Sequence, residues 1–213
     1  MLSEYVYGSQ AEQNADFIYG IKQNGTDILS YSYDKLARLS SRTLNTTTGF
    51  TSNYTYLAGA NAGSTTTLIE SINNGGNTLS YTYDDVGNIT EIKKNNHVYE
   101  SYEYDGLNQL TKVTRGTGED ADYYTYTYDN GGNILEVKLK NTTVKSYDYD
   151  YAKDDPRESI GWKDLLTKYN DTDIEYDDIG NPLVYRDGFT FEWSNGRQLR
   201  RQGDGSAVSF FID

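Results

Sequence analysis

Cysteine is absent from this sequence of 213 residues, and proline, histidine and methionine are scarce. Without cysteine there is no disulfide bond, no thiol nucleophile and no cysteine-ligated metal. No stretch approaches the roughly 18 consecutive apolar residues of a membrane-spanning helix. The first five residues lack the basic region and apolar run of a signal peptide. If the intact protein is exported, we therefore expect its export signal to lie outside this sequence.

Basic residues are also in short supply. Lysine and arginine number 19 against 32 aspartates and glutamates, which gives a formal net charge of −13. Proteins that bind nucleic acid neutralise phosphates with a basic patch, and an acidic surface opposes that approach. No cluster of lysine or arginine forms a local exception. The sequence therefore predicts no nucleic-acid partner.

Aliphatic residues are too few for an ordinary core, since all hydrophobic residues together make up 36%. Aromatic residues are plentiful instead, with 22 tyrosines, six phenylalanines and two tryptophans. A tyrosine buries a large ring and still places its hydroxyl where water or a backbone group can reach it. This composition favours a thin structure, such as a single sheet, in which few side chains are fully enclosed.

One phrase recurs along the chain. An aromatic residue, any residue, Tyr and Asp are followed after two residues by Gly or a polar residue, then Asn or Arg, and then Leu or Ile. Three weaker copies centre on Tyr56, Tyr149 and Phe191, and successive copies are 15–27 residues apart. The residues of the clearest copies are Tyr31, Tyr33 and Asp34; Tyr81, Tyr83, Asp84, Gly87 and Asn88; Tyr102, Tyr104 and Asp105; Tyr126, Tyr128, Asp129, Gly132 and Asn133; and Tyr176, Asp177, Gly180 and Asn181.

Each copy predicts a β-hairpin. The aromatic–polar–Tyr alternation has the period of a strand with its rings on one face. Asp begins a turn because its carboxylate accepts hydrogen bonds from nearby backbone N–H groups, and Gly-Asn tolerates the positive φ angles of such turns. We predict an all-β fold of tandem antiparallel β-hairpins in one long curved or spiralling sheet. The array spans residues 31–213, and residues 1–30 form a degenerate first repeat or N-terminal hairpin.

Three details remain open at this point. After each turn the apolar residues are three apart, as in Ile89 and Ile92, which indicates either a β-bulge or partial burial of both sheet faces. Residues 61–76 are predicted to form a long turn around one strand at residues 68–72. Residues 154–170 are predicted to hold a short strand or a single helical turn that packs Trp162 on the sheet.

No constellation of catalytic residues emerges, so we predict neither an enzyme nor a cofactor or metal site. The single histidine, His97, lies on a polar turn and is interpreted as solvated. The recurring Asp residues resemble turn signals rather than paired catalytic carboxylates, because active sites are single and turn signals repeat. Two acidic clusters lack EF-hand spacing and are interpreted as solvated charge. The clusters comprise Asp148, Asp150, Asp154 and Asp155, and Asp171, Asp173, Asp177 and Asp178.

The tyrosines are interpreted as cross-strand packing, with a glycan-binding surface as the alternative.

The phrase Tyr-x-Tyr-Asp-x-x-Gly-Asn-x-Ile/Leu resembles the YD repeat of the rearrangement-hotspot (Rhs) family, which is related to wall-associated proteins and teneurins. The resemblance covers about residues 17–213, and residues 162–170, 179–183 and 189–199 are similar to the late part of such arrays. It implies a bacterial surface or secreted polymorphic toxin, in which the repeats coil into a hollow shell around a variable C-terminal toxin.

The same resemblance implies the partners of this chain, namely the rest of a parent repeat protein and its C-terminal toxin domain. The self-cleavage motif of the family is not carried over, because residues 155–158 lack its glycine pattern. The chain is expected to be an open part of a shell, secreted or attached to the cell surface or cell wall. Open sheet edges invite pairing with other strands, so we also predict self-association.

Overall fold

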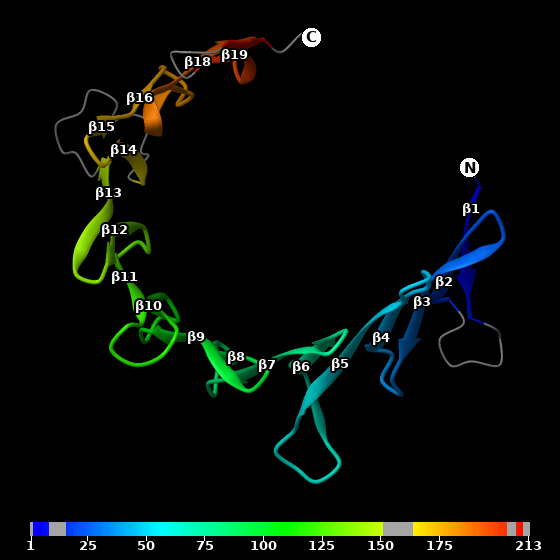
Figure 1. The fold of residues 1–213 in the computed structure, drawn as a ribbon. Coiled ribbons are helices and arrows are strands. Elements are labelled where there is room, and N and C mark those ends of the chain that lie inside the picture. The colour runs from blue at the N-terminus through cyan, green and yellow to red at the C-terminus, as the bar shows by residue number, and fades with distance from the viewer. Residues whose placement is uncertain (1, 9–15, 151–163, 204–207, 211–213) are drawn as a thin grey trace. The chain divides into compact units, whose positions relative to one another are not determined.

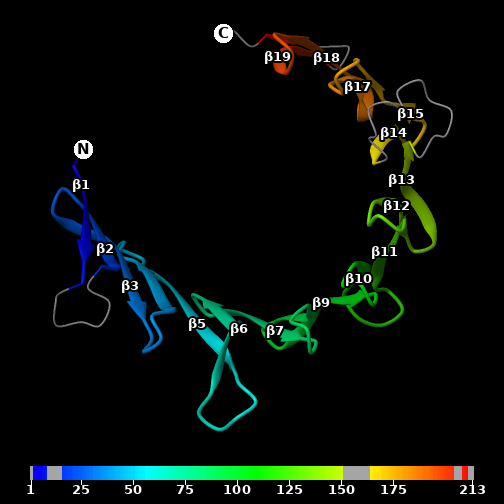
Figure 2. The ribbon, with the colours of Figure 1, turned by 180° about the vertical axis from the view of Figure 1, so that it is seen from behind.

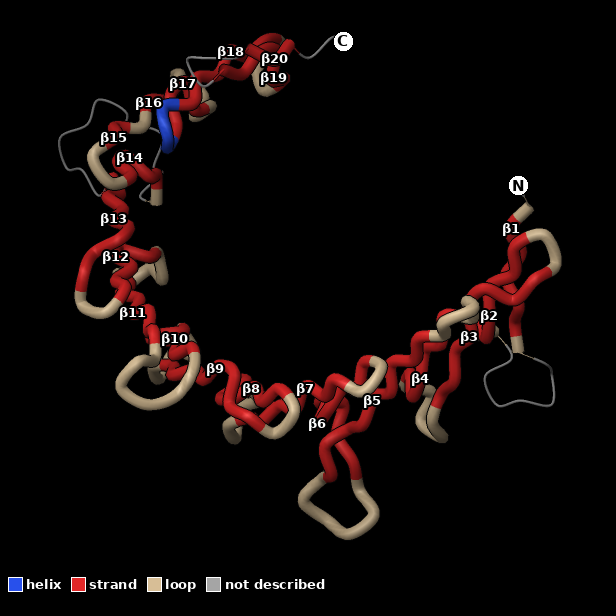
Figure 3. The backbone as a smooth tube through the Cα atoms, viewed as in Figure 1, coloured by secondary structure: helices blue, strands red, loops and turns tan. Residues whose placement is uncertain are grey.

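The computed structural model describes residues 2–8, 16–150, 164–203 and 208–210, and these residues form strands joined by turns (Figure 1). One short 3-10 helix, η2 (Arg186–Gly188), interrupts the strands (Figure 3). None of the described helical segments is long or apolar enough to span a membrane. The strands are β1 (Ser3–Tyr7), β2 (Ile18–Gln23), β3 (Thr26–Tyr33), β4 (Leu39–Leu44), β5 (Phe50–Ala58), β6 (Thr65–Asn74), β7 (Asn77–Tyr83), β8 (Ile89–Lys94), β9 (His97–Tyr104), β10 (Leu110–Arg115), β11 (Asp122–Tyr128), β12 (Ile134–Leu139), β13 (Thr142–Asp150), β14 (Leu165–Tyr169), β15 (Thr172–Asp173), β16 (Glu175–Tyr176), β17 (Pro182–Tyr185), β18 (Phe189–Ser194), β19 (Gln198–Gly203) and β20 (Val208–Phe210).

Within each of two sheets, consecutive strands are hydrogen-bonded to each other in sequence order. One sheet runs from β1 to β15 and a second from β16 to β20. The pairs are antiparallel, as expected for consecutive hairpins. The all-β array of tandem hairpins predicted from the sequence is thus confirmed.

By its internal contacts the chain divides into two units. The first holds Met1–Tyr102 and Thr114–Ala121, and the second holds Glu103–Val113 and Asp122–Asp213. Within each unit, neighbouring hairpins lie side by side in both views of the ribbon (Figure 2).

A β-bulge in each repeat hairpin explains the three-residue spacing of the apolar residues. In the β7–β8 hairpin, Tyr81 lies opposite Ile92 and Tyr83 lies opposite Ile89, and the register shifts between Thr82 and Tyr83. Thr90 is the extra residue of this bulge. It offsets the alternation of side chains between the two sheet faces by one residue, so both isoleucines lie on the same face as the tyrosines. The hairpins β3–β4 and β11–β12 show the same shift. Of the two explanations left open by the sequence, the bulge is correct.

The core is thin, as the composition predicted. Among the described residues, only four hydrophobic side chains are less than a tenth exposed: Val113, Val137, Tyr169 and Ile174. Most tyrosines are half-buried. Stability therefore depends on repeated contacts between neighbouring hairpins more than on one enclosed core.

The two irregular segments of the sequence prediction are resolved as follows. The strand predicted at residues 68–72 is longer, since β6 spans Thr65–Asn74 and the turn is confined to residues 59–64. Strand β5 extends beside it past Tyr56, so this hairpin projects beyond its neighbours in the first unit (Figure 3). Residues 165–169 form strand β14, which agrees with the short strand that was one of the two alternatives predicted for residues 154–170. The predicted contact of Trp162 lies outside the described residues.

Candidate functional site: the contacts that join the repeats

Every clear copy of the motif forms the same Asp turn. In the turn of residues 84–88, the Asp84 Oδ1 atom accepts the backbone N–H groups of Val86 and Asn88 at 3.1 and 2.8 Å. Its Oδ2 atom accepts the side-chain amide of Asn88 at 2.9 Å. The backbone closes the same loop, because the Asp84 N–H donates to the Asn88 carbonyl and the Gly87 N–H donates to the Asp84 carbonyl. Equivalent bonds to the aspartate form at Asp34, Asp105, Asp129 and Asp177.

These hydrogen bonds favour the charged carboxylate. The pKa of Asp84 lies below its ordinary value, mainly because the Asn88 amide donates to the carboxylate. The same cause, from Asn133, lowers the pKa of Asp129. At Asp34 and Asp177, desolvation raises the pKa, but the combined hydrogen bonds outweigh it and the net shift is again downward.

The fourth residue of each turn has a positive φ. Glycine occupies this position in three turns, with φ between 81° and 94° at Gly87, Gly132 and Gly180. Asn108 and Ala37 take its place in the other two, at 63° and 64°. Glycine and asparagine adopt this region readily, but alanine does so at a steric cost. The motif Asp-x-x-Gly-Asn is therefore explained by backbone geometry at each of its positions.

A second recurring contact joins a repeat hairpin to the preceding one. The Tyr83 hydroxyl at the end of β7 donates to the Ile69 carbonyl in β6 at 2.7 Å. The acceptor lies at the bulge of the preceding hairpin, since Ile69 is the residue opposite Tyr56. We call this contact the inter-repeat lock. It forms at Tyr33 with Ile18, Tyr56 with Leu39, Tyr83 with Ile69, Tyr128 with Leu110 and Tyr176 with Leu166, with donor–acceptor distances of 2.7–2.9 Å.

Tryptophan replaces tyrosine in the last lock. The Trp193 Nε1–H donates to the Pro182 carbonyl at 2.7 Å, and Trp193 pairs with Leu199 across a bulge as the tyrosines do. The sequence analysis centred this copy of the motif on Phe191, whereas Trp193 lies at the bulge and makes the hydrogen bond. Phe191 instead holds the position of the first aromatic of the pair, two residues before the lock.

The locking tyrosines are neutral hydrogen-bond donors in a shielded position. Burial raises the pKa of the Tyr33, Tyr56, Tyr83 and Tyr128 hydroxyls above the ordinary value. Phe17 and Tyr19 pack edge-on against the Tyr33 ring, with centroids 5.0 and 5.3 Å away. Each lock therefore combines a half-buried ring with a hydroxyl that has a hydrogen-bond acceptor.

The first aromatic residue of each pair lies on the same sheet face as the second one, opposite a residue of the bulged strand. Tyr31, Tyr81 and Tyr126 pair with Arg42, Ile92 and Val137. Tyr102 donates its hydroxyl to the Glu100 carboxylate within its own strand. Tyr104 is half-buried at the end of β9, in the position of the other second aromatics.

The opposite edge of the sheet carries asparagine clamps that the sequence analysis missed. Asn95, in the turn after β8, donates its N–H to the Thr78 carbonyl and accepts the Thr78 N–H on its Oδ1 atom. Asn24 makes the same pair of bonds with Leu2, and Asn170 makes it with Ser146. All three asparagines have φ near 50°. The signal in the sequence is an asparagine at the start of each of these turns, but its partner lies 17–24 residues away.

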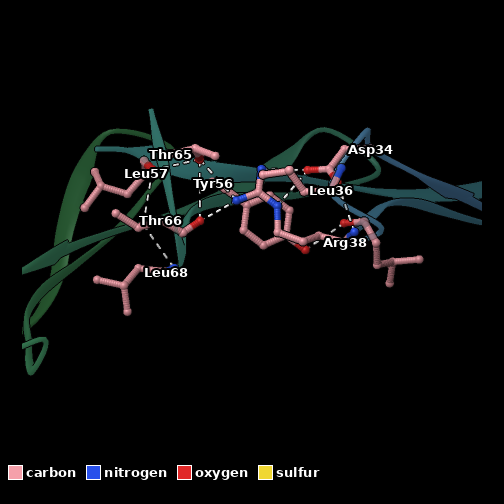
Figure 4. Close-up of polar contacts among 9 residues, drawn as sticks. Asp34, Leu36, Arg38, Tyr56, Leu57, Thr65, Thr66 and Leu68 are labelled. Atoms are coloured by element: carbon pink, nitrogen blue, oxygen red, sulfur yellow. Dashed lines mark hydrogen bonds and ion pairs between the residues drawn. The ribbon is translucent and has the colours of Figure 1, made fainter. Parts of the chain in front are cut away.

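Arg38 strengthens one junction further (Figure 4). It holds the position that asparagine occupies in three other turns, and its guanidinium makes an ion pair with Asp34 at 2.6 Å. The guanidinium lies over the Tyr56 ring, 3.9 Å from its centroid, and also donates to the Thr65 hydroxyl and the Thr66 carbonyl. One side chain thus joins the first Asp turn to the first residues of β6, next to the turn of the long β5–β6 hairpin.

The residues considered for chemistry form no catalytic arrangement in the described part of the chain. The His97 ring is exposed and contacts the Asn95 carbonyl of its own turn. No group of three His, Cys, Asp or Glu side chains among the described residues is placed to hold a metal ion. Asp154 and Asp155 of the first acidic cluster lie outside the described residues. The recurring contacts join strands, and they bring no two motif carboxylates together at one site.

Comparison with known proteins identifies the fold. No protein-family model matches the chain, and no curated protein matches it significantly. Among solved structures, the chain is similar over 94% of its length to a chain of the Photorhabdus luminescens Tc holotoxin pore, at 17% sequence identity and a TM-score of 0.63. The chain has the fold of this segment of the Tc holotoxin chain. Two TcdB2-TccC3 structures match the chain equally well, at 16% identity and a TM-score of 0.63, over 94% and 96% of its length.

The chain spans 11% of the length of each of these neighbours. The arrangement of strands is therefore shared with one segment of a much longer protein. At this level of sequence identity the similarity establishes the fold, and the fold agrees with the family resemblance of the repeated motif.

Proposed function

We propose that this chain is a non-catalytic structural segment of a larger secreted or surface protein of the Rhs type. In this proposal its repeats form part of the wall of a shell that encloses a C-terminal toxin. The observation that carries the proposal is the inter-repeat lock, which recurs with the same donor position and the same acceptor position along the array. A contact that recurs in every unit serves a wall better than an active site, which needs one unique arrangement.

The neighbours support the enclosing role. They are Tc toxin assemblies by name, and the chain aligns with a segment of them over nearly its whole length. A wall must resist local opening, and the β7–β8 hairpin is fastened at its bulge and at both of its turns. An acidic surface also suits a wall that does not bind nucleic acid.

The test is limited proteolysis of the intact parent protein. The proposal expects a C-terminal domain that is protected from protease within the parent protein and is digested when expressed alone. Opening the wall with Tyr→Phe changes at Tyr33, Tyr83 and Tyr128 together is expected to increase cleavage of that domain. A parent protein without a further C-terminal domain, or one whose domain is equally sensitive in both settings, would contradict enclosure.

Glycan binding is the second candidate. Among the tyrosines with described side chains, Tyr5, Tyr7 and Tyr99 are more than half exposed, at 57%, 58% and 54%. Exposed rings of this kind can stack on sugar faces. A glycan array with the wild-type chain and a Tyr99→Ala variant tests the idea. Binding that the variant loses would support it, and an array without hits would reject it.

A further inference from the structure

The dipeptide Asn-Gly occurs four times in the sequence. The four steps are Asn24-Gly25, Asn74-Gly75, Asn130-Gly131 and Asn195-Gly196. A glycine after asparagine leaves its backbone nitrogen unhindered, so this nitrogen can attack the carbonyl carbon of the asparagine side chain. Asparagine is a thermolabile residue for this reason. Whether a given step reacts depends on the groups that hold the side chain and on the group that accepts the proton of the glycine N–H.

Asn130 is the one of these four asparagines whose side chain is not held by another described residue. The bonds of the other three join Asn24 Oδ1 to the Leu2 N–H at 3.2 Å, Asn74 Oδ1 to the Ser52 hydroxyl at 2.7 Å, and Asn195 Nδ2 to Gln198 Oε1 at 2.9 Å. Asn74 is held most firmly, because Ser52 is fully buried and the Gly75 N–H already donates to the Thr51 carbonyl at 3.0 Å. The Asn130 side chain is exposed, so it is free to rotate toward the Gly131 nitrogen.

The turn that contains Asn130 also supplies a base for this reaction. Asp129 Oδ1 accepts the Gly131 N–H at 2.8 Å, and this N–H must lose its proton when its nitrogen attacks. The Asn133 side-chain amide lowers the pKa of Asp129, so the carboxylate is ionised at neutral pH. The other Asp turns hold the equivalent N–H in the same way, but the residue before that N–H is not an asparagine. Of the five Asp turns, only this one brings a side-chain amide, a glycine nitrogen and a carboxylate together.

We propose that Asn130 is a self-modification site, at which the chain converts its own asparagine to aspartate and isoaspartate with water as the co-reactant. The Gly131 nitrogen attacks the Asn130 Cγ atom, and its proton passes to Asp129 Oδ1. The Cγ–Nδ2 bond then breaks as the Asp129 carboxyl returns that proton to the leaving nitrogen, which departs as ammonia. Water opens the resulting succinimide ring at either of its carbonyls. No atom is oxidised or reduced in these steps.

The modification weakens the turn in which it occurs. Isoaspartate adds one methylene group to the backbone of a turn that is closed by the Asp129 N–H bond to the Asn133 carbonyl at 3.0 Å and the Gly132 N–H bond to the Asp129 carbonyl at 3.2 Å. The new carboxylate also adds negative charge beside Asp129 and near Asp164, whose Oδ1 accepts the Asn133 amide at 3.1 Å. We therefore expect the turn between β11 and β12 to open first as the protein ages. The inference goes beyond the proposed scaffold function and does not depend on toxin enclosure.

The test follows deamidation at each Asn-Gly step of the purified chain. The chain is incubated at neutral pH, and peptide mapping by mass spectrometry quantifies aspartate and isoaspartate at each step. We expect Asn130 to react first, at least about tenfold faster than Asn74, the internal control that is held at both its side chain and the following N–H. In concentrated urea, where the turns are unfolded, the four steps are expected to react at similar rates. Equal rates at Asn130 and Asn74 in the folded chain would overturn the proposal, as would an excess at Asn130 that persists in urea.

Asp129→Asn tests the role of the carboxylate. The variant keeps an oxygen that can accept the Gly131 N–H, but it removes the base. We expect deamidation at Asn130 to slow by at least about tenfold, although the variant also loosens the turn, which urea unfolding measures separately. A carboxylate that only held the turn in place would have the opposite effect, because its loss would free Asn130 and speed the reaction. A rate in Asp129→Asn equal to or above that of the wild type would refute the assignment of Asp129 as the base.

Discussion

Tyr83→Phe removes one inter-repeat lock and leaves its ring in place. The Tyr83 hydroxyl donates to the Ile69 carbonyl at 2.7 Å in a half-buried position. Loss of a neutral hydrogen bond of this kind costs about 0.5–1.5 kcal/mol, and the ring packing is retained. For a chain of roughly 200 residues, each kcal/mol lowers the melting temperature by about 2–4 °C. The expected decrease is therefore about 1–6 °C.

The assay is thermal and urea unfolding of the purified chain, followed by far-UV circular dichroism. Tyr99→Phe is the matched control, because Tyr99 lies in the neighbouring hairpin but is 54% exposed. The control is expected to unfold like the wild type. A Tyr83→Phe chain as stable as the wild type, or a Tyr99→Phe chain that loses as much stability, would refute the lock as a source of stability.

Four further predictions concern the turns. The pKa of Asp84 is lowered in the folded state, so its stabilising effect is complete above the unfolded value of about 3.9 and is lost as pH falls through the lower folded value. Urea unfolding should show this acid loss, and Asn88→Ala should reduce it, since Asn88 is the main cause of the shift. Ala37→Gly relieves a residue at φ 64° and should stabilise the chain by about 0.5–1 kcal/mol in the same assay, whereas a decrease would show that the turn is not strained. Lys140→Asn places the clamp residue in a turn with φ 47°, where the backbone N–H already donates to the Tyr123 carbonyl, and should raise stability by up to about 1 kcal/mol. Arg38→Met removes the guanidinium above the Tyr56 ring and should lower the free energy of unfolding, measured in urea, by about 0.5–1 kcal/mol. The matched control is Arg42→Met, which changes an exposed arginine and should leave the free energy of unfolding unchanged.

The local parts of the fold were predictable from the sequence. Asp84, Gly87 and Asn88 fulfil their roles within one turn of five residues, so their types identify the turn without knowledge of the rest of the chain. The tyrosine alternation likewise identifies a strand by its period. The spacing of Ile89 and Ile92 did not discriminate between a bulge and two buried faces, because both place apolar residues three apart.

The contacts between hairpins were not predictable in the same way. The acceptor of the Tyr83 lock is a backbone carbonyl 14 residues away, and any residue type supplies a carbonyl. The β1–β2 hairpin has the register shift of a repeat, but Tyr5 and Tyr7 were missed because Gly8 follows them in place of the diagnostic Asp. Trp193 was not recognised as the second aromatic of its repeat, and Phe191 was chosen instead, because Ser194 rather than Asp follows Trp193. In both hairpins the register across the bulge identifies the repeat where the motif does not.

Amide hydrogen exchange of the wild-type chain and the Tyr83→Phe variant tests most directly whether the locks join neighbouring hairpins. In an array coupled only to nearest neighbours, loss of one lock opens the two hairpins that it joins. We predict faster exchange in β5–β8 of the variant and unchanged exchange in β2, β3, β11 and β12. Unchanged exchange in β5–β8, or an equal increase along the whole chain, would contradict the account.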